Sequence, residues 1–142
     1  MAKQRLVIDA NIVIRAIIGK RARTLIAQYC EKTAFYVAES NFEEALRYLN
    51  ELGEKRGLSE PVIQASLQTF VTMVQLVPDE ELAPMRIKAT ERIGQRDPND
   101  WPAVAAALLL DCPIWTEDAD FFGSGIATWT SSTVEIYLAD KH

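Results

Sequence analysis

The sequence predicts an α/β protein in which helices cover both faces of a parallel sheet. Short, almost continuously apolar runs at 5–9, 35–38 and 74–77 alternate with longer stretches of helical periodicity. Strands that are apolar on both faces are typical of a parallel sheet buried between helices. The 142 residues, 49% of them hydrophobic, can bury a sizeable core. Because no linker, repeat or low-complexity segment divides them, we predict a single domain over residues 1–142.

The first 57 residues are predicted to contain two strands and three helices. In chain order these are a strand at 5–9, a helix at 11–18, a helix to about 31, a strand at 35–38 and a helix at 40–52. Ser40 and Glu43 have the spacing of a capping box, so we expect the third helix to start at Ser40. Gly53 and Gly57 are expected to close it.

The remaining residues continue the alternation. They are predicted to form a helix at 59–71, a strand at 74–77, a charge-rich helix at 81–93, an apolar helix at 101–110, strands at 113–116 and 126–129, and a terminal helix through 138. Ser59 is expected to cap its helix, and Ser132 and Glu135 form a second capping-box pattern. Asp97-Pro98-Asn99-Asp100 is turn-and-cap chemistry ahead of the apolar helix.

Missing residue types exclude several kinds of site. The only histidine is His142, so a nucleophile activated by histidine and a histidine-based zinc site are excluded. Cys30 and Cys112 are far apart in the sequence and indicate neither a zinc ribbon nor a redox pair. The longest apolar stretch, 101–115, is broken by Asp111 and is too short for a membrane span. With no signal peptide evident, we expect a cytoplasmic protein without a membrane partner.

The charge is distributed unevenly. The chain has 15 Lys and Arg against 20 Asp and Glu, a net charge of −5. Residues 1–32 carry seven basic and two acidic residues, whereas residues 33–142 carry eight basic and eighteen acidic ones. An evenly basic coat for nucleic acid is therefore excluded, but a local basic patch is not.

Several of the acidic residues follow or flank predicted strands. Ligands of open α/β sheets bind beyond the carboxyl ends of the strands, so we expect the acids placed there to converge. They are Asp9 at the end of the first strand, Glu44 on the helix after the second, Asp100 before the apolar helix, and Asp118 and Asp120 after the strand at 113–116. Carboxylates packed together repel each other unless a cation lies among them. Oxygen ligands alone suit Mg²⁺ or Mn²⁺.

Each acid also has a simpler explanation. Asp100 can be an N-cap, and the acids after residue 116 can belong to a solvated turn. Glu43 and Glu44 can lie on a solvated helix face, with Glu43 serving as the capping partner of Ser40 and Glu44 free for chemistry. Asp9 is different, because a carboxylate that closes a buried strand is expensive to bury unpaired.

Four segments together resemble the PIN-domain nucleases, in the order of that family. Val7-Ile8-Asp9-Ala10-Asn11-Ile12-Val13 resembles the opening strand motif, and Phe42-x-Glu44-Ala45 the acid carried on a helix. Asp97-Pro98-Asn99-Asp100-Trp101 is similar to the segment before the long Ala-rich helix. Trp115 to Phe121 is similar to the T-x-D-x-D-F stretch, so the resemblance covers essentially the whole chain.

The resemblance implies a three-layer α/β/α domain with four or five parallel strands that hydrolyses phosphodiester bonds, mostly in RNA, with Mg²⁺ or Mn²⁺. Carried over, the metal-binding acids are Asp9, Glu44, Asp100, Asp118 and Asp120, with Asn11 and Thr116 as accessory polar groups. A compact domain of this length resembles the VapC-like toxin ribonucleases of toxin–antitoxin pairs. Those toxins usually form homodimers and are inhibited by a small antitoxin.

The residues agree with a water nucleophile activated by metal, because the sequence offers no evident general base. We expect Lys20, Arg21 and Arg23 to contact the RNA backbone, although a solvated loop explains them about as well. One alternative is a Mg²⁺-dependent phosphatase or phosphotransferase with Asp9 as nucleophile, which is weakened because Asn11 stands where a second Asp is wanted. Another is a catalytically inactive PIN-like interaction domain.

Overall fold

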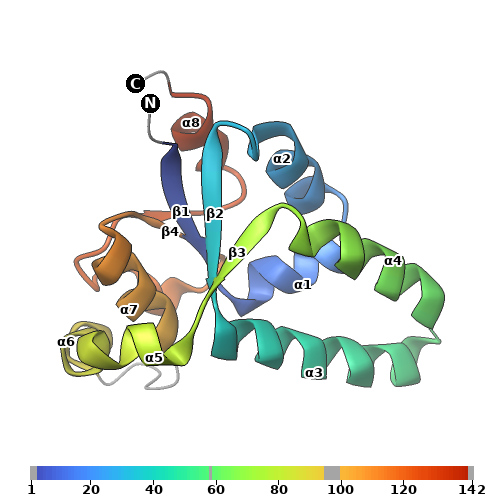
Figure 1. The fold of residues 1–142 in the computed structure, drawn as a ribbon, viewed down its shortest axis with the longest axis horizontal. Coiled ribbons are helices and arrows are strands. Elements are labelled where there is room, and N and C mark those ends of the chain that lie inside the picture. Colours follow the sequence, from blue (N-terminus) through green and yellow to red (C-terminus); the bar gives the residue numbers. More distant parts are fainter. Residues whose placement is uncertain (1–2, 58, 95–99, 141–142) are drawn as a thin grey trace.

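A five-stranded parallel sheet forms the centre of the molecule (Figure 1). The computed structural model describes residues 3–57, 59–94 and 100–140. The strands are β1 (Gln4–Ile8), β2 (Thr33–Ala38), β3 (Val74–Val77), β4 (Ile114–Trp115) and β5 (Thr128–Trp129), in the spatial order β3-β2-β1-β4-β5. The chain therefore starts in the middle of the sheet, builds one half and returns to build the other. This order places the end of β1 beside the end of β4, where Ile8 pairs with Trp115.

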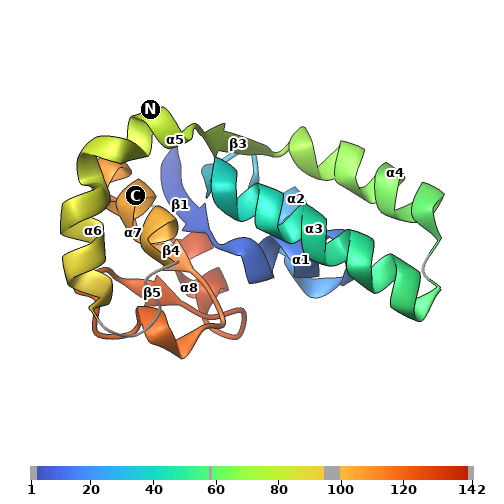
Figure 2. The same cartoon turned by 90° about the horizontal axis from the view of Figure 1, so that it is seen from below.

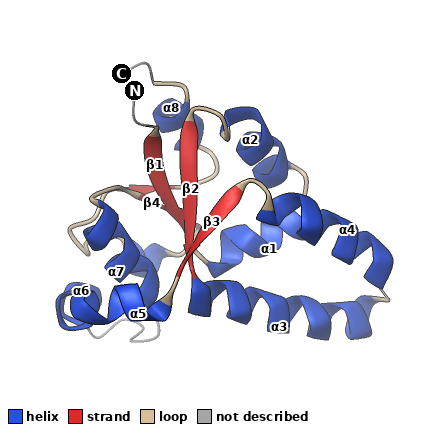
Figure 3. Ribbon diagram, in the orientation of Figure 1, coloured by secondary structure: helices blue, strands red, loops and turns tan. Residues whose placement is uncertain are grey.

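Helices cover both faces of the sheet, which confirms the predicted three-layer α/β/α fold (Figures 2 and 3). They are α1 (Ala10–Ile18), α2 (Arg21–Tyr29), α3 (Glu39–Arg56), α4 (Glu60–Val71), α5 (Asp79–Leu82), α6 (Arg86–Ile93), α7 (Trp101–Leu110) and α8 (Val134–Leu138), with short 3₁₀ turns η1 (Ala83–Met85) and η3 (Ala119–Phe121). Leu6 and Ile8 of β1 pack with α1–α4 and α8, whereas Val7 packs with α5–α7. This is the alternation of side chains along a strand buried on both faces.

The apolar helix α7 is explained by what surrounds it. Residues 102–107 are all buried, because α7 lies between the sheet and α6 (Figure 2). A helix that is apolar on every side is stable only in such a place.

Three local predictions are wrong. The predicted helix 81–93 is broken into α5, η1 and α6, because Pro84 cannot continue the hydrogen-bond ladder. Ser40 does not cap α3, which begins one residue earlier at Glu39 with Ala38 as its N-cap. The helix also continues through Gly53 and ends at Gly57, whose φ of 63° is a left-handed conformation that glycine adopts easily.

The predicted caps of the other helices are only partly confirmed. Ser59 is the N-cap residue of α4 but makes no side-chain cap bond. The pattern at Ser132 and Glu135 does not cap α8, whose N-cap is Thr133. Residues 97–99 of the predicted turn and His142 lie outside the described residues. None of the helices in the described ranges is long and apolar enough to cross a membrane.

Candidate metal centre

Asp9 lies at the end of β1, where it is held rigidly. It is the N-cap residue of α1, and its Oδ1 accepts a hydrogen bond from the backbone N–H of Ile12 at 3.2 Å. Its Oδ2 accepts from Nδ2 of Asn11 at 3.0 Å and from the hydroxyl of Thr116. The side chain is only 5% exposed. Both carboxylate oxygens are therefore fixed in place, by the first turn of α1 and by the residue that follows β4.

The surroundings of Asp9 disfavour its negative charge. Burial raises its pKa from the ordinary 3.8 to about 7, and this is the largest influence. The hydrogen bonds from Thr116 and Ile12 lower the pKa in part, whereas the nearby charges of Asp118 and Glu44 raise it further. A carboxylate in this position is stabilised by a proton or by a cation.

The loop after β4 continues the network from Asp9. The Thr116 hydroxyl, which donates to Asp9, accepts from the backbone N–H of Asp118 at 2.9 Å. Asp118 is the N-cap residue of η3, and its Oδ1 accepts from the backbone N–H of Asp120 at 2.9 Å. Asn11 reaches the same loop by accepting from the backbone N–H of Glu117 at 3.5 Å. The two strand ends are thus joined by side chains that the sequence had singled out.

Three carboxylates come together beside this network. Oxygen atoms of Asp100, Asp118 and Asp120, one from each side chain, all lie within 4.8 Å of one another, and all three residues are half-buried. Asp100 is the N-cap residue of α7, but its side chain makes no cap bond, so the simple capping explanation does not hold for it. An all-oxygen donor set of this kind fits Mg²⁺ or Mn²⁺.

The other two predicted acids border this cluster. Asp9 and Glu44 lie outside it, although both Glu44 and Asp118 are close enough to affect the charge of Asp9. Glu44 is exposed on α3, which follows β2, the strand on the opposite side of β1 from β4. The structure therefore brings all five acids to the carboxyl edge of the sheet, as a cluster of three with two neighbours.

The predicted basic segment lies elsewhere. Arg21 at the start of α2 forms an ion pair with Glu135 of α8 at 3.6 Å. Tyr137 of the same helix donates a hydrogen bond to the backbone oxygen of Arg5, near the start of β1. Lys20, Arg21 and Arg23 are thus associated with the amino edge of the sheet, opposite the acids, and their contact with RNA stays a prediction.

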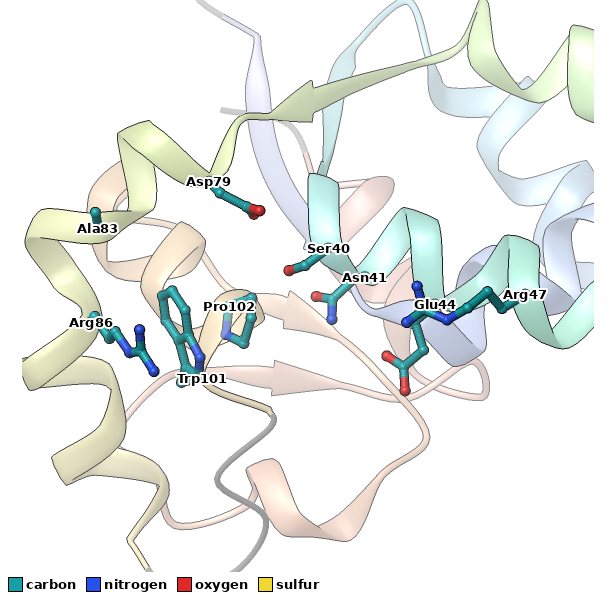
Figure 4. A pocket seen from close by; sticks show the side chains of 9 residues that line it. All are labelled: Ser40, Asn41, Glu44, Arg47, Asp79, Ala83, Arg86, Trp101 and Pro102. Carbon is teal, nitrogen blue, oxygen red and sulfur yellow. The ribbon is translucent and has the colours of Figure 1, made fainter.

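A pocket that the sequence did not reveal opens beside Glu44 (Figure 4). Its volume is about 570 Å³, and it lies between the starts of α3 and α7 and the segment from α5 to α6. It is lined by Ser40, Asn41, Glu44, Arg47, Asp79, Ala83, Arg86, Trp101 and Pro102. Ser40 was interpreted as a capping residue and Asn41 was given no role, but their place directly after the end of β2 was a signal for a site.

The chain is similar to known proteins in two ways, through a family match to its sequence and through solved structures of similar fold. The family described as PIN domain matches residues 7–139. Among curated proteins there is no significant match. Three solved structures are similar in fold, with 12–19% sequence identity.

The first is VapBC2 from Rickettsia felis bound to a DNA fragment from its promoter, with a TM-score of 0.64 and 12% identity over 89% of this chain and 98% of that one. PAE2754 from Pyrobaculum aerophilum has a TM-score of 0.69 and 19% identity over 99% and 92%. FitAcB from Neisseria gonorrhoeae has a TM-score of 0.59 and 17% identity over 89% and 98%.

Proposed function

Since this chain belongs to the PIN domain family, we propose that it is an endoribonuclease that depends on Mg²⁺ or Mn²⁺ and is the toxin of a toxin–antitoxin pair. The observation that carries the proposal is the cluster of Asp100, Asp118 and Asp120, joined to buried Asp9 through the hydroxyl of Thr116. Such a concentration of like charge destabilises the fold unless it serves to bind a cation.

The contacts suggest a different role for each residue of the proposed site. Asp100, Asp118 and Asp120 would hold the cation, with Asp9 and Glu44 beside them. Thr116 and Asn11 orient Asp9 by donating to it. A cation held there would supply a lowered pKa for the attacking water and positive charge beside the phosphoryl oxygens. We expect products with a 5′-phosphate and a 3′-hydroxyl, and no 2′,3′-cyclic phosphate, because the 2′-hydroxyl is not the nucleophile.

The test is RNA cleavage by the full chain with Mg²⁺ or Mn²⁺ and with EDTA, for the wild type and Asp9→Asn. We expect cleavage by the wild type only with the metal, and a severe loss in Asp9→Asn. Cleavage that survives chelation or the substitution would refute the mechanism. The nucleophilic role of Asp9 in a phosphatase is disfavoured, since both oxygens accept hydrogen bonds. An acid-stable phosphoprotein trapped in a single turnover would revive it.

We also propose a homodimer and a small antitoxin as partners. The fold similarity to VapBC2 and FitAcB supports the antitoxin. The α3–α4 hairpin projects from the sheet (Figure 1) and exposes Tyr48, Val62 and Val71, an apolar surface suited to a second copy of the chain. A monomeric mass at micromolar concentration in solution would contradict the dimer.

A further inference from the structure

The pocket beside Glu44 has a chemistry unlike that of the acidic cluster. We propose that it binds one unpaired nucleobase of the RNA, next to the bond that is cut. This inference rests on the proposed function and adds to it a subsite that selects the substrate. Its volume of about 570 Å³ falls within the roughly 300–1,000 Å³ typical of pockets for small ligands.

Two polar atoms in the lining of the pocket are buried and have no hydrogen-bond partner among the described residues. The Oγ of Ser40 and the Oδ1 of Asn41 are inaccessible to solvent and accept no hydrogen bond within the described part of the chain. Asn41 is only 6% exposed. In Figure 4 the side chains of both residues extend from α3 toward Pro102 and the cavity. Unpartnered buried polar atoms are destabilising, so a ligand in the pocket that hydrogen-bonds to both would be favoured.

The edge of a nucleobase carries hydrogen-bond donors and acceptors that can pair with the side chains of Ser40 and Asn41. Asn presents an acceptor and a donor side by side, and a serine hydroxyl can do either. The carboxylate of Asp79 also lines the pocket and adds an acceptor. Acceptors therefore predominate, which suits a base with an exocyclic amino group, adenine or cytosine.

An aromatic ring and two cations complete the pocket. Trp101 lines it, and the guanidinium of Arg86 lies over the indole, 5.0 Å from the ring centroid. Bases stack on aromatic rings, and an arginine beside the ring strengthens such a platform. Arg47 and Arg86 make no ion pair within the described ranges and can face the phosphates on either side of the base.

The position of the pocket connects it to the cluster. Trp101 directly follows Asp100, and Glu44 is both a pocket residue and a neighbour of Asp9. A base held against Trp101 therefore places its own phosphates beside the carboxylates. This geometry favours a nucleotide over a peptide, because a nucleotide carries the phosphate that a cation among the carboxylates would bind.

The test compares binding of fluorescein-labelled r(A)₁₂, r(C)₁₂ and an abasic ribose-phosphate 12-mer to the full chain, by anisotropy in EDTA so that no cleavage occurs. The three oligomers carry the same phosphate charge, so differences isolate the base. We expect r(A)₁₂ or r(C)₁₂ to bind the wild type about tenfold more tightly than the abasic oligomer. In Asn41→Ala and Ser40→Ala this difference should shrink to about threefold or less.

Asn50→Ala, on the exposed face of α3, is the matched control and should keep the wild-type discrimination. Asn41→Ala should lose little thermal stability, because the Oδ1 that it removes is buried without a hydrogen-bond partner in the described part of the chain. Equal binding of all three oligomers by the wild type, full discrimination by Asn41→Ala, or no binding at all would each overturn the subsite. The metal-dependent cleavage assay tests the proposed nuclease activity separately. A failure of the base subsite can therefore be distinguished from a failure of the proposed function.

Discussion

The two edges of the sheet differ in how their charged groups are arranged. At the amino edge Glu135 accepts from the Tyr29 hydroxyl at 2.8 Å and pairs with Arg21 at 3.6 Å. Arg5 on the same side donates to the backbone oxygen of Leu110 at 3.2 Å. At the carboxyl edge the acids are grouped with one another, and Asp9 and Asp118 accept hydrogen bonds from hydroxyl, amide and backbone N–H donors.

The difference separates charges that pair within the chain from charges that we propose bind a cation. The pairing at the amino edge contributes a little stability whatever is bound. Like charges at the carboxyl edge repel one another, and a cation among them would convert that repulsion into attraction. Substitutions at the two edges should therefore have opposite consequences for activity and stability.

The largest effect is expected from Asp118→Asn. Because Asp118 belongs to the cluster and holds the backbone of Asp120, its loss should reduce RNA cleavage by at least about a hundredfold. Asp111→Asn is the matched control, since Asp111 is exposed and its φ of 51° is tolerated by Asn. Initial cleavage rates with Mn²⁺ measure both, and similar losses in the two variants would show that the comparison of edges is wrong.

Asp9→Asn should stabilise the protein without metal. Between the ordinary pKa of 3.8 and the folded value of about 7, the folded state retains a proton that the unfolded state has released. Wild-type stability should therefore fall as pH rises through this range, by a few kcal/mol on the order of the pKa shift.

The Asn variant lacks this slope. Urea unfolding at pH 4.5 and pH 8 in EDTA measures it, with Asp111→Asn as the control that keeps the wild-type slope. A wild type as stable at pH 8 as at pH 4.5 would contradict the burial argument.

A smaller effect should separate Glu44 from Glu43. Of these two glutamates, only Glu44 raises the pKa of Asp9 and lines the pocket. Glu44→Gln is expected to reduce cleavage about tenfold, whereas Glu43→Gln should be close to wild type. The two are compared at equal Mn²⁺ concentration. The reverse ranking would assign the helix-borne acid to Glu43.

The smallest effect concerns the basic segment. Lys20→Ala with Arg23→Ala leaves the Arg21–Glu135 pair intact. If both residues contact RNA phosphates, affinity should drop a few-fold and the salt dependence should flatten by a slope of about 1.4. Anisotropy titrations at several salt concentrations measure this. An unchanged affinity would limit nucleic-acid contacts to the other edge.

The sequence predicted the strands and the convergence of acids well, because both follow from chain order. Asp9 had to lie at the carboxyl end of β1, and the parallel order brought the loop after β4 next to it. The Thr116 hydroxyl between Asp9 and Asp118 depends on the register of β1 and β4, which sequence alone does not specify. The sequence therefore assigns Thr116 a role near the metal only through its resemblance to the PIN-domain nucleases.

Sequence patterns within one segment gave wrong predictions where contacts with other segments determine the helix boundaries or form the pocket. The break at Pro84 has a physical cause that the charge pattern of 81–93 concealed. Ser40 and Glu43 matched a capping box, but β2 continues so directly into α3 that Ala38 takes the N-cap position. The pocket combines residues from α3, α5, α6 and α7, and such a juxtaposition is not visible in any one segment.

The most direct test of the account is a Mn²⁺ titration of the full chain, followed by electron paramagnetic resonance of the free ion at pH 6 and pH 8. The wild type and Asp111→Asn should bind Mn²⁺, more tightly at pH 8 because the proton of Asp9 has then left. Asp118→Asn should bind it at least about tenfold more weakly. Wild-type protein that leaves Mn²⁺ free, or an Asp118→Asn variant that binds it as well as the wild type, would contradict a metal centre at the carboxyl edge.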